Sequence, residues 1–256
     1  MRSGRGPSVI LVHGYGESLV AWRGLFDRLA AHADVVALDL PGFGLADKPP
    51  AGYTTEALGT AVLAAATAMQ IDSFVIVGHS LGGAVAVAAS LAAPSRIRAL
   101  VLIDPAGVSS PAMLPDSVGA VAASARAAIA EYEAQRSRFT SVHDPAWLGE
   151  DSVAAAYLPA DDPAYRAALE AVLREFDFAY LVPERLRQLV RPTLILWGAY
   201  DRVVPVAQGT LLQRELPAAR LVVFARTWHR PHVERPVETA DSILSLLRTL
   251  QEGSHP

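Results

Sequence analysis

The chain has 256 residues, of which 52% are hydrophobic and 19% are charged, and its net charge is −4. This length suits one α/β domain with a large core, and the apolar content excludes disorder as the dominant state. The chain has 22 basic and 26 acidic residues, so it has no overall positive field that would favour nucleic acid as a partner. The absence of cysteine excludes disulfides, thiolate metal sites and a cysteine nucleophile.

The sequence carries no strong targeting or membrane signal. The apolar stretch near the start, residues 9–12, is too short for the core of a signal peptide. The longest uncharged apolar run, residues 81–93, falls short of the roughly 20 residues that cross a bilayer. We therefore expect a soluble, cytoplasmic protein without a membrane partner.

Short apolar runs alternate with helical patterns through residue 107. The expected strands are residues 9–12, 35–38, 74–77 and 100–103, and the expected helices are residues 19–31, 54–69 and 84–92. Continuous apolar strands that alternate with helices indicate a parallel sheet that is covered on both faces.

The alternation stops after Gly107 and returns near residue 191. Between these points the pattern is helical, with residues 117–137 and 163–176 as the longest pieces. Strands at 193–197 and 219–224 and an amphipathic helix at 237–250 follow. The simplest organisation is a core of residues 1–107 and 191–256 with an inserted helical cap, or lid, of residues 108–190.

The segment Gly78-His79-Ser80-Leu81-Gly82 fits the pattern Gly-x-Ser-x-Gly. An apolar strand precedes it and a helix of small residues follows, which is the context of a nucleophile elbow. Ser80 would sit in a sharp, strained turn that glycines two positions away permit, because they have no Cβ atom to clash. The amino end of the helix offers N–H groups to a developing oxyanion.

Four further segments follow one another along the chain. They are His13-Gly14-Tyr15-Gly16; Asp39-Leu40-Pro41-Gly42-Phe43-Gly44; residues 197–205, with the pattern Trp-Gly-x-x-Asp-x-x-x-Pro; and residues 229–236, with the pattern His-x-Pro-His-x-Glu-x-Pro. With the Ser80 elbow, they resemble the α/β-hydrolase fold family, and its small esterase, haloperoxidase-like and C–C hydrolase branches in particular. The resemblance implies a mainly parallel sheet of about six strands, helices on both faces and a helical cap.

A serine hydroxyl needs a general base that is oriented by a carboxylate. The resemblance implies His229 as the base, with His232 as the nearest rival, which we interpret as structural. For the carboxylate it implies Asp201, and Ser80, Asp201 and His229 reproduce the chain order of the family. Asp104, at the end of an earlier strand, is the competitor; the residues around Asp201 match the family motif better.

The resemblance also implies an oxyanion hole that is made by the backbone N–H groups of Tyr15 and Leu81. His13 is expected to brace the loop of Tyr15 through hydrogen bonds, and His79 to point away from the nucleophile. Because the family's epoxide hydrolases and haloalkane dehalogenases have an aspartate nucleophile, Ser80 favours an acyl-enzyme instead.

The chain departs from the family pattern at two places. Only twelve residues precede His13, whereas the family usually begins with two more strands, so the sheet is expected to lack them and to have an unusual edge. The residue before the proposed base is usually glycine, and here it is Trp228. This indole either lines the acyl pocket or changes the path of the loop.

Large apolar residues of the insert, and of the loop that carries His229, are expected to form a substrate pocket. The pocket candidates are Met113, Phe139, Trp147, Phe178 and Trp228. Most large residues of a helical insert form its own core, so only some of these are expected to face the substrate. The expected substrates are short or medium, uncharged acyl or aryl esters.

The leading hypothesis is a serine hydrolase of carboxylic esters that acts on a small-molecule substrate. A C–C hydrolase, a lactonase or a perhydrolase would use the same three side chains. A non-hydrolytic member, either a small-molecule receptor or a biosynthetic enzyme, is the competing hypothesis from another class. The sequence implies no metal or organic cofactor, because it has neither a ligand cluster nor a dinucleotide fingerprint.

Overall fold

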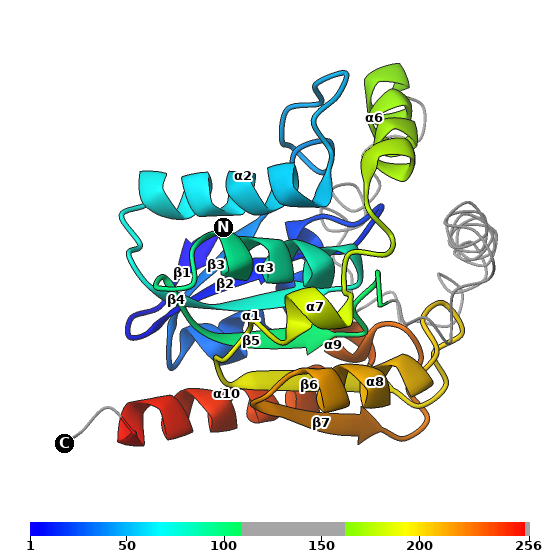
Figure 1. Cartoon of the computed structure of the whole chain (residues 1–256). Helices are drawn as coiled ribbons and strands as arrows, with labels where there is room; N and C mark the ends of the chain where they lie inside the picture. Colours follow the sequence, from blue (N-terminus) through cyan, green and yellow to red (C-terminus); the bar gives the residue numbers. More distant parts are fainter. Residues whose placement is uncertain (109–161, 254–256) are drawn as a thin grey trace.

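A seven-stranded sheet is the centre of the computed structural model, which describes residues 1–108 and 162–253 (Figure 1). The strands are β1 (Arg2–Ser3), β2 (Ser8–Val12), β3 (Asp34–Leu38), β4 (Phe74–His79), β5 (Ile97–Ile103), β6 (Thr193–Gly198) and β7 (Ala219–Phe224). Their order across the sheet is β1-β3-β2-β4-β5-β6-β7, and all neighbours except β1 and β3 are parallel. The expected mainly parallel sheet, with its six apolar strands, is therefore confirmed.

The short strand β1 corrects the expected number of about six strands. It pairs antiparallel with β3, with Arg2 opposite Val36, and so covers part of the edge that was expected to be unusual. The Arg2 guanidinium also forms an ion pair of 2.8 Å with Asp34. Two exposed polar residues form no apolar run, so sequence patterning gives no sign of such a strand.

The helices are a 3-10 helix η1 (Leu19–Trp22), α1 (Arg23–Ala30), α2 (Thr55–Ala68), α3 (Leu81–Ala92), α6 (Pro163–Glu175), α7 (Pro183–Leu186), α8 (Ala207–Glu215), α9 (Pro231–Glu234) and α10 (Pro236–Glu252). Thr54 caps α2, because its hydroxyl accepts a hydrogen bond of 3.1 Å from the Ala57 N–H. Helix α7 lies in the segment that was predicted to be helical, whereas α8 and α9 are additions to the predicted set. No helix in residues 1–108 or 162–253 is both long and apolar enough to cross a membrane.

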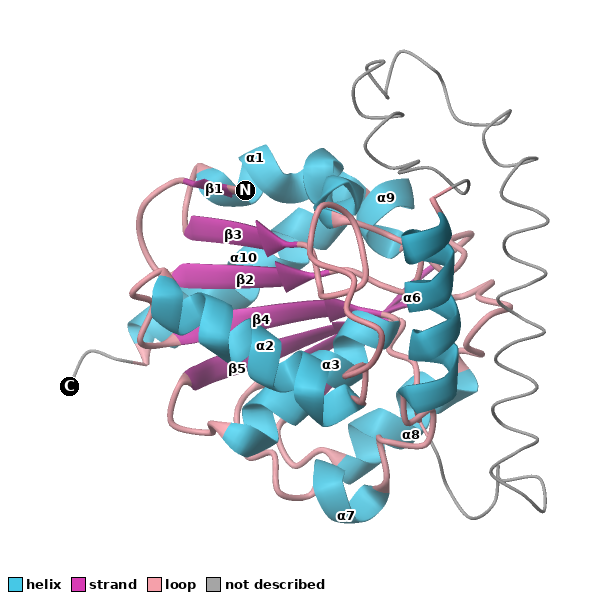
Figure 2. Cartoon of the chain, turned by 90° about the horizontal axis from the view of Figure 1, so that it is seen from above, coloured by secondary structure: helices cyan, strands magenta, loops and turns pink. Residues whose placement is uncertain are grey.

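The two faces of the sheet pack against different helices (Figure 1). In β2, Ile10 and Val12 belong to the cluster with α2 and α3, whereas Val9 and Leu11 belong to the cluster with α1 and α10. Figure 2 shows β3, β2, β4 and β5 side by side in the layer between them. Because both faces are buried, the central strands β2, β4 and β5 consist mainly of apolar residues and do not alternate between apolar and polar residues in sequence.

Part of the predicted cap lies within the described residues. Helices α6 and α7 belong to this region, and Val172 and Phe176 join the same apolar cluster as α2 and α3. The predicted helix at 117–137 lies outside the described residues, so the division into core and cap stays a prediction.

Close backbone packing explains the glycines at the elbow. A Cβ atom on Gly78 would lie 2.1 Å from the Gly82 carbonyl oxygen, and only a movement of the backbone could remove this steric clash. We expect Gly78→Ala to lower the free energy of unfolding by about 1–3 kcal/mol, measured by urea unfolding. Gly253→Ala is the control, because its Cβ would lie 3.5 Å from the nearest atom. Equal unfolding midpoints for the two variants would contradict this packing argument.

Candidate active site

The candidate site lies at the carboxyl ends of the parallel strands. Ser80 follows β4 directly, Asp201 lies in the loop after β6, and His229 lies in the loop after β7. Parallel strands end at one edge of the sheet, so residues far apart in sequence meet there. In the sequence, 149 positions separate Ser80 from His229.

Ser80 occupies the sharp turn between β4 and α3. Its φ of 51° is unusual for a residue with a side chain, and it is the N-cap of α3. The turn is fixed on both sides, because the Ser80 N–H donates to the Ile103 carbonyl and the Ser80 carbonyl accepts from Gly83 and Ala106, each at 2.9 Å. This over-determined turn directs the hydroxyl toward the base loop.

Ser80, His229 and Asp201 form a continuous hydrogen-bonded chain. The Nε2 atom of His229 lies 3.0 Å from the Ser80 Oγ, and its Nδ1 lies 2.7 Å from the Asp201 Oδ2. All three residues are at most 9% exposed. With the Nδ1 proton donated to the carboxylate, Nε2 is available to accept the serine proton.

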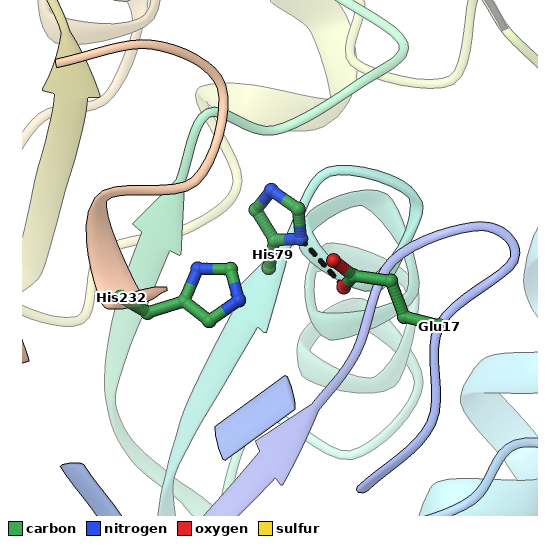
Figure 3. Close-up of side chains that lie close together, drawn as sticks. All are labelled: Glu17, His79 and His232. Atoms are coloured by element: carbon green, nitrogen blue, oxygen red, sulfur yellow. Dashed lines mark hydrogen bonds and ion pairs between the residues drawn. The ribbon is translucent and has the colours of Figure 1, made fainter. Parts of the chain in front are cut away.

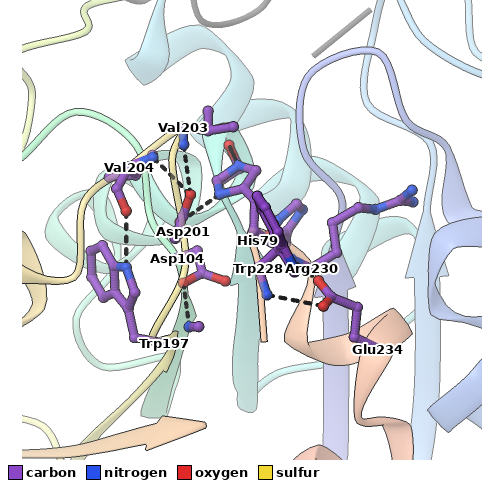
Figure 4. Close-up of polar contacts among 12 residues, drawn as sticks. His79, Asp104, Trp197, Asp201, Val203, Val204, Trp228, Arg230 and Glu234 are labelled. Carbon is purple, nitrogen blue, oxygen red and sulfur yellow. Dashed lines mark hydrogen bonds and ion pairs between the residues drawn. The ribbon is translucent and has the colours of Figure 1, made fainter. Parts of the chain in front are cut away.

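Asp201 is held in place by its own loop. Its Oδ1 accepts hydrogen bonds from the backbone N–H groups of Val203 and Val204, at 2.8 and 2.9 Å (Figure 4). These bonds leave Oδ2 facing His229. The carboxylate is therefore fixed in the orientation that a general base requires.

Asp104, the competing acid, lies close to Asp201 (Figure 4). Its Oδ1 accepts a 2.9 Å hydrogen bond from the Gly198 N–H. Burial, together with the negative charge of Asp201, raises the pKa of Asp104 well above its usual range. A carboxyl group whose ionised form is disfavoured is a poor partner for an imidazolium, and the hydrogen bond of His229 goes to Asp201.

The two predicted oxyanion donors lie in segments that meet at Ser80. Leu81 is the first residue of α3, where helix N–H groups have no partner within the helix. Tyr15 follows Gly14, and a Cβ atom on Gly14 would lie 3.2 Å from the Ser80 Cβ. The loop of Tyr15 thus packs directly against Ser80.

His13 has the hydrogen bonds that a bracing residue needs. Its Nδ1 donates to the Gly14 carbonyl at 2.8 Å, and its Nε2 accepts from the Leu40 N–H at 3.1 Å. Burial lowers the pKa of His13, which agrees with a neutral ring that has one donor and one acceptor.

The predicted pocket residues are placed in part. Trp228 is 36% exposed, and its indole packs edge-on against Tyr200 beneath the Arg202 guanidinium. Phe178 is half-buried and packs edge-on against Phe176, with 5.1 Å between the ring centroids. Three other candidates lie outside the described residues: Met113, Phe139 and Trp147.

Two carboxylates, Glu17 and Glu234, hold the loops of the site in a role that the sequence did not predict. Glu234 accepts backbone N–H bonds from Trp228 and Arg230, at 2.9 and 3.1 Å (Figure 4). Glu17 lies beside His79, with its Oε2 2.9 Å from the His79 Nδ1. In the sequence, Glu234 is the acidic residue of the His-x-Pro-His-x-Glu-x-Pro segment, and Glu17 is one acidic residue soon after the His-Gly segment; neither position alone indicates burial or a role in holding a loop.

The other two histidines near the nucleophile lie as expected. His79 turns away from Ser80 toward Glu17, and His232 is fully buried between the rings of Trp22 and His79 (Figure 3). Burial, and then the positive charge of His79, lowers the pKa of His232 well below its usual range, so its ring is neutral. This neutral ring packs as an aromatic side chain.

Among residues 1–108 and 162–253, two groups of side chains have metal-donor atoms within 4.8 Å of one another. The first is Glu17, His79 and His232, and the second is His79, Asp104 and His229. In the first group Glu17 is already bonded to His79, and the Arg230 guanidinium, 2.9 Å away, opposes a further cation. The second group includes the proposed base, so neither group fits a resident metal well.

Comparisons with known proteins give matches along almost the whole chain. Residues 7–236 match the family model described as the alpha/beta hydrolase fold. Pimeloyl-[acyl-carrier protein] methyl ester esterase of Aeromonas hydrophila is 30% identical over 254 residues, with 94% of this chain and 96% of the esterase covered.

Two solved structures have similar folds. One is Est816, an N-acyl homoserine lactone degrading enzyme, with a TM-score of 0.74 and 26% identity over 97% of this chain and 95% of that chain. The other is the CarC enzyme, a serine hydrolase involved in carbazole degradation, with a TM-score of 0.77 and 26% identity over 97% of this chain and 93% of that chain.

Proposed function

Because this chain belongs to the α/β-hydrolase family and is a hydrolase of that family, we propose that it is a serine hydrolase of carboxylic esters. The observation that carries the proposal is the hydrogen-bonded chain from the Ser80 hydroxyl through His229 to Asp201. These distances, 3.0 and 2.7 Å, lie within the range for proton transfer between a nucleophile and its base.

In the proposed reaction, the Ser80 Oγ attacks the ester carbonyl carbon while His229 Nε2 takes the hydroxyl proton. The tetrahedral intermediate places its negative oxygen against the N–H groups of Tyr15 and Leu81. Collapse breaks the bond to the leaving alcohol, which takes the proton from His229, and leaves an acyl-enzyme. A water molecule, deprotonated by His229, then releases the acid and restores Ser80.

We propose uncharged esters with small or medium acyl groups as substrates. The methyl ester esterase among the relatives supports an ester as the scissile group. Arg230, the cation beside the base, is paired with Glu17 at 2.9 Å and is not placed as a recognition group for a substrate carboxylate. A cap of residues 108–190 would complete the pocket above Ser80.

A lactonase is the second candidate, because a lactone is a cyclic ester and passes through the same acyl-enzyme. The similarity to an N-acyl homoserine lactone degrading enzyme supports this candidate. The two activities differ only in whether the alcohol stays attached to the acyl group.

Labelling with a fluorophosphonate, followed by mass spectrometry of the peptides, tests the proposal. We expect one adduct, on Ser80, and turnover of p-nitrophenyl esters that is fastest for short or medium chains. An N-acyl homoserine lactone, assayed in parallel, separates the two candidates by the ratio of their kcat/KM values. Absence of both labelling and turnover would overturn the proposal.

A further inference from the structure

We propose that Glu17 is a positioning residue whose one buried carboxylate fixes two loops together. The first is the oxyanion loop, residues 13–18, which carries Tyr15, and the second is the base loop, residues 225–230, which carries His229. This inference rests on the proposed function, because it concerns how the groups around Ser80 are held. The cluster that carries it is Glu17, His79 and Arg230, called here the Glu17 cluster.

Glu17 contacts three segments that are far apart in the sequence. Its Oε2 accepts a 2.9 Å hydrogen bond from the Gly14 N–H, in the loop that carries Tyr15. The same oxygen lies 2.9 Å from His79 Nδ1, and Oε1 lies 2.9 Å from the Arg230 Nε. The Glu17 side chain is only 6% exposed, so these contacts replace its hydration.

His79 continues the connection to the base. Its Nε2 lies 2.7 Å from the backbone carbonyl oxygen of His229. A carbonyl oxygen only accepts hydrogen bonds, so Nε2 is a donor. The carboxylate of Glu17 also only accepts, so Nδ1 is a donor too, and His79 carries both ring protons. His13, which faces one acceptor and one donor, shows the contrasting neutral pattern.

The charges agree with this assignment. Burial opposes ionisation of Glu17, but the positive charges of His79 and Arg230 outweigh it and hold the pKa of Glu17 well below its usual range. His232, which packs against His79, stays neutral. One carboxylate therefore neutralises part of the charge of two cations in a buried setting, where Coulomb interactions are strong.

The Glu17 cluster also leaves little room at Gly14. A Cβ atom on Gly14 would lie 2.8 Å from the His79 Nδ1 and 3.1 Å from the Glu17 Oε2. The oxyanion loop thus lies directly on the bonded pair. A shift of Glu17 or His79 would move the Gly14 N–H and the His229 carbonyl at the same time.

Replacement of Glu17 by glutamine keeps the size of the side chain but removes its charge. If the amide oxygen stays on Gly14, the amide nitrogen faces the Arg230 guanidinium, which is also a donor. If the amide turns over, the Gly14 N–H loses its acceptor. Either arrangement leaves His79 without a counter-ion. The hydrogen bond from His79 Nε2 to the backbone carbonyl of His229 is therefore weakened.

The experiment compares Glu17→Gln with Glu215→Gln. Glu215 is a matched control, because it also bridges two arginines, Arg187 at 2.7 Å and Arg214 at 3.0 Å, and its side chain is 11% exposed. It lies at the end of α8, outside the loops of the site. Steady-state kinetics with a p-nitrophenyl ester and the rate of fluorophosphonate labelling are measured, with sites counted by the final extent of labelling.

We expect Glu17→Gln to lower kcat per labelled site by between about 10-fold and 100-fold, the size of effect expected for a misplacement of up to 1 Å. KM should change by less than about threefold, since Glu17 does not contact substrate, and labelling should slow in parallel with kcat. Glu215→Gln should keep the wild-type kcat. A Glu17→Gln enzyme with wild-type kcat per site, even if fewer molecules fold, would overturn the proposal.

The variant His79→Gln tests the connection to His229. Because Glu17 acts partly through His79, the double variant Glu17→Gln with His79→Gln should lose less than the product of the two single losses. Multiplicative losses would overturn the connection, as would a folded His79→Gln with wild-type kcat. If Glu17→Gln does not fold, His79→Gln alone decides. A wild-type enzyme that is not labelled would instead overturn the proposed function.

Discussion

Replacement of Ser80 by alanine should abolish fluorophosphonate labelling and lower kcat for p-nitrophenyl esters on the order of a millionfold. The reason is that the Ser80 hydroxyl, whose Oγ lies 3.0 Å from His229 Nε2, is the proposed nucleophile. Alanine has no hydroxyl, so no acyl-enzyme forms. The remaining rate would come from the oxyanion donors and from substrate binding alone.

The measurement pairs intact-protein mass spectrometry after labelling with initial rates at high enzyme concentration. Far-ultraviolet circular dichroism serves as the control for folding, because the Oγ atom makes no contact on which the turn depends: that turn is fixed by backbone bonds to Ile103, Gly83 and Ala106. A labelled, active Ser80→Ala enzyme would show that another nucleophile performs the reaction.

Replacement of Asp201 by asparagine should lower kcat by about 10⁴-fold while the protein stays folded. The Oδ1 position accepts two backbone N–H bonds, from Val203 and Val204, so the amide oxygen of asparagine stays there. The amide nitrogen then faces His229 Nδ1 and donates to it. This favours the tautomer with the proton on Nε2, which cannot accept the proton of Ser80.

The variant Asp104→Asn is the matched control for the choice of acid. Burial and the negative charge of Asp201 raise the pKa of Asp104 and so disfavour its ionised form, and asparagine can still accept the hydrogen bond from the Gly198 N–H. We expect kcat to fall by less than about tenfold, from altered packing close to Asp201. A larger loss in Asp104→Asn than in Asp201→Asn would reverse the assignment of the acid.

The two acids show where sequence patterning is strong and where it is weak. The motif around Asp201 favoured it, but Asp104 also ends a strand at the same edge of the sheet, and the sequence left both open. The hydrogen bond of His229 to Asp201 and the burial of Asp104 separate them. Both facts depend on how β5 and β6 lie next to each other, which no local pattern contains.

The strand β1 and the Glu17 cluster could not be predicted from the sequence, for a related reason. Two polar residues such as Arg2 and Ser3 gain strand geometry only by pairing with β3. Glu17 looks like an ordinary charged loop residue until its partners, His79 and Arg230, are brought to it from distant segments.

Apolar periodicity and glycine spacing act over a few residues, so the six apolar strands, the main helices and the elbow at Ser80, with the family that it indicates, could be predicted from the amino-acid sequence. The choice of the acid that meets His229, and the burial of Glu17 beside His79, depended instead on the folded arrangement of distant segments. These outcomes depend on desolvation and on the pairing of donors with acceptors. Both are properties of the groups that surround a side chain, and the fold brings those groups together from opposite ends of the chain.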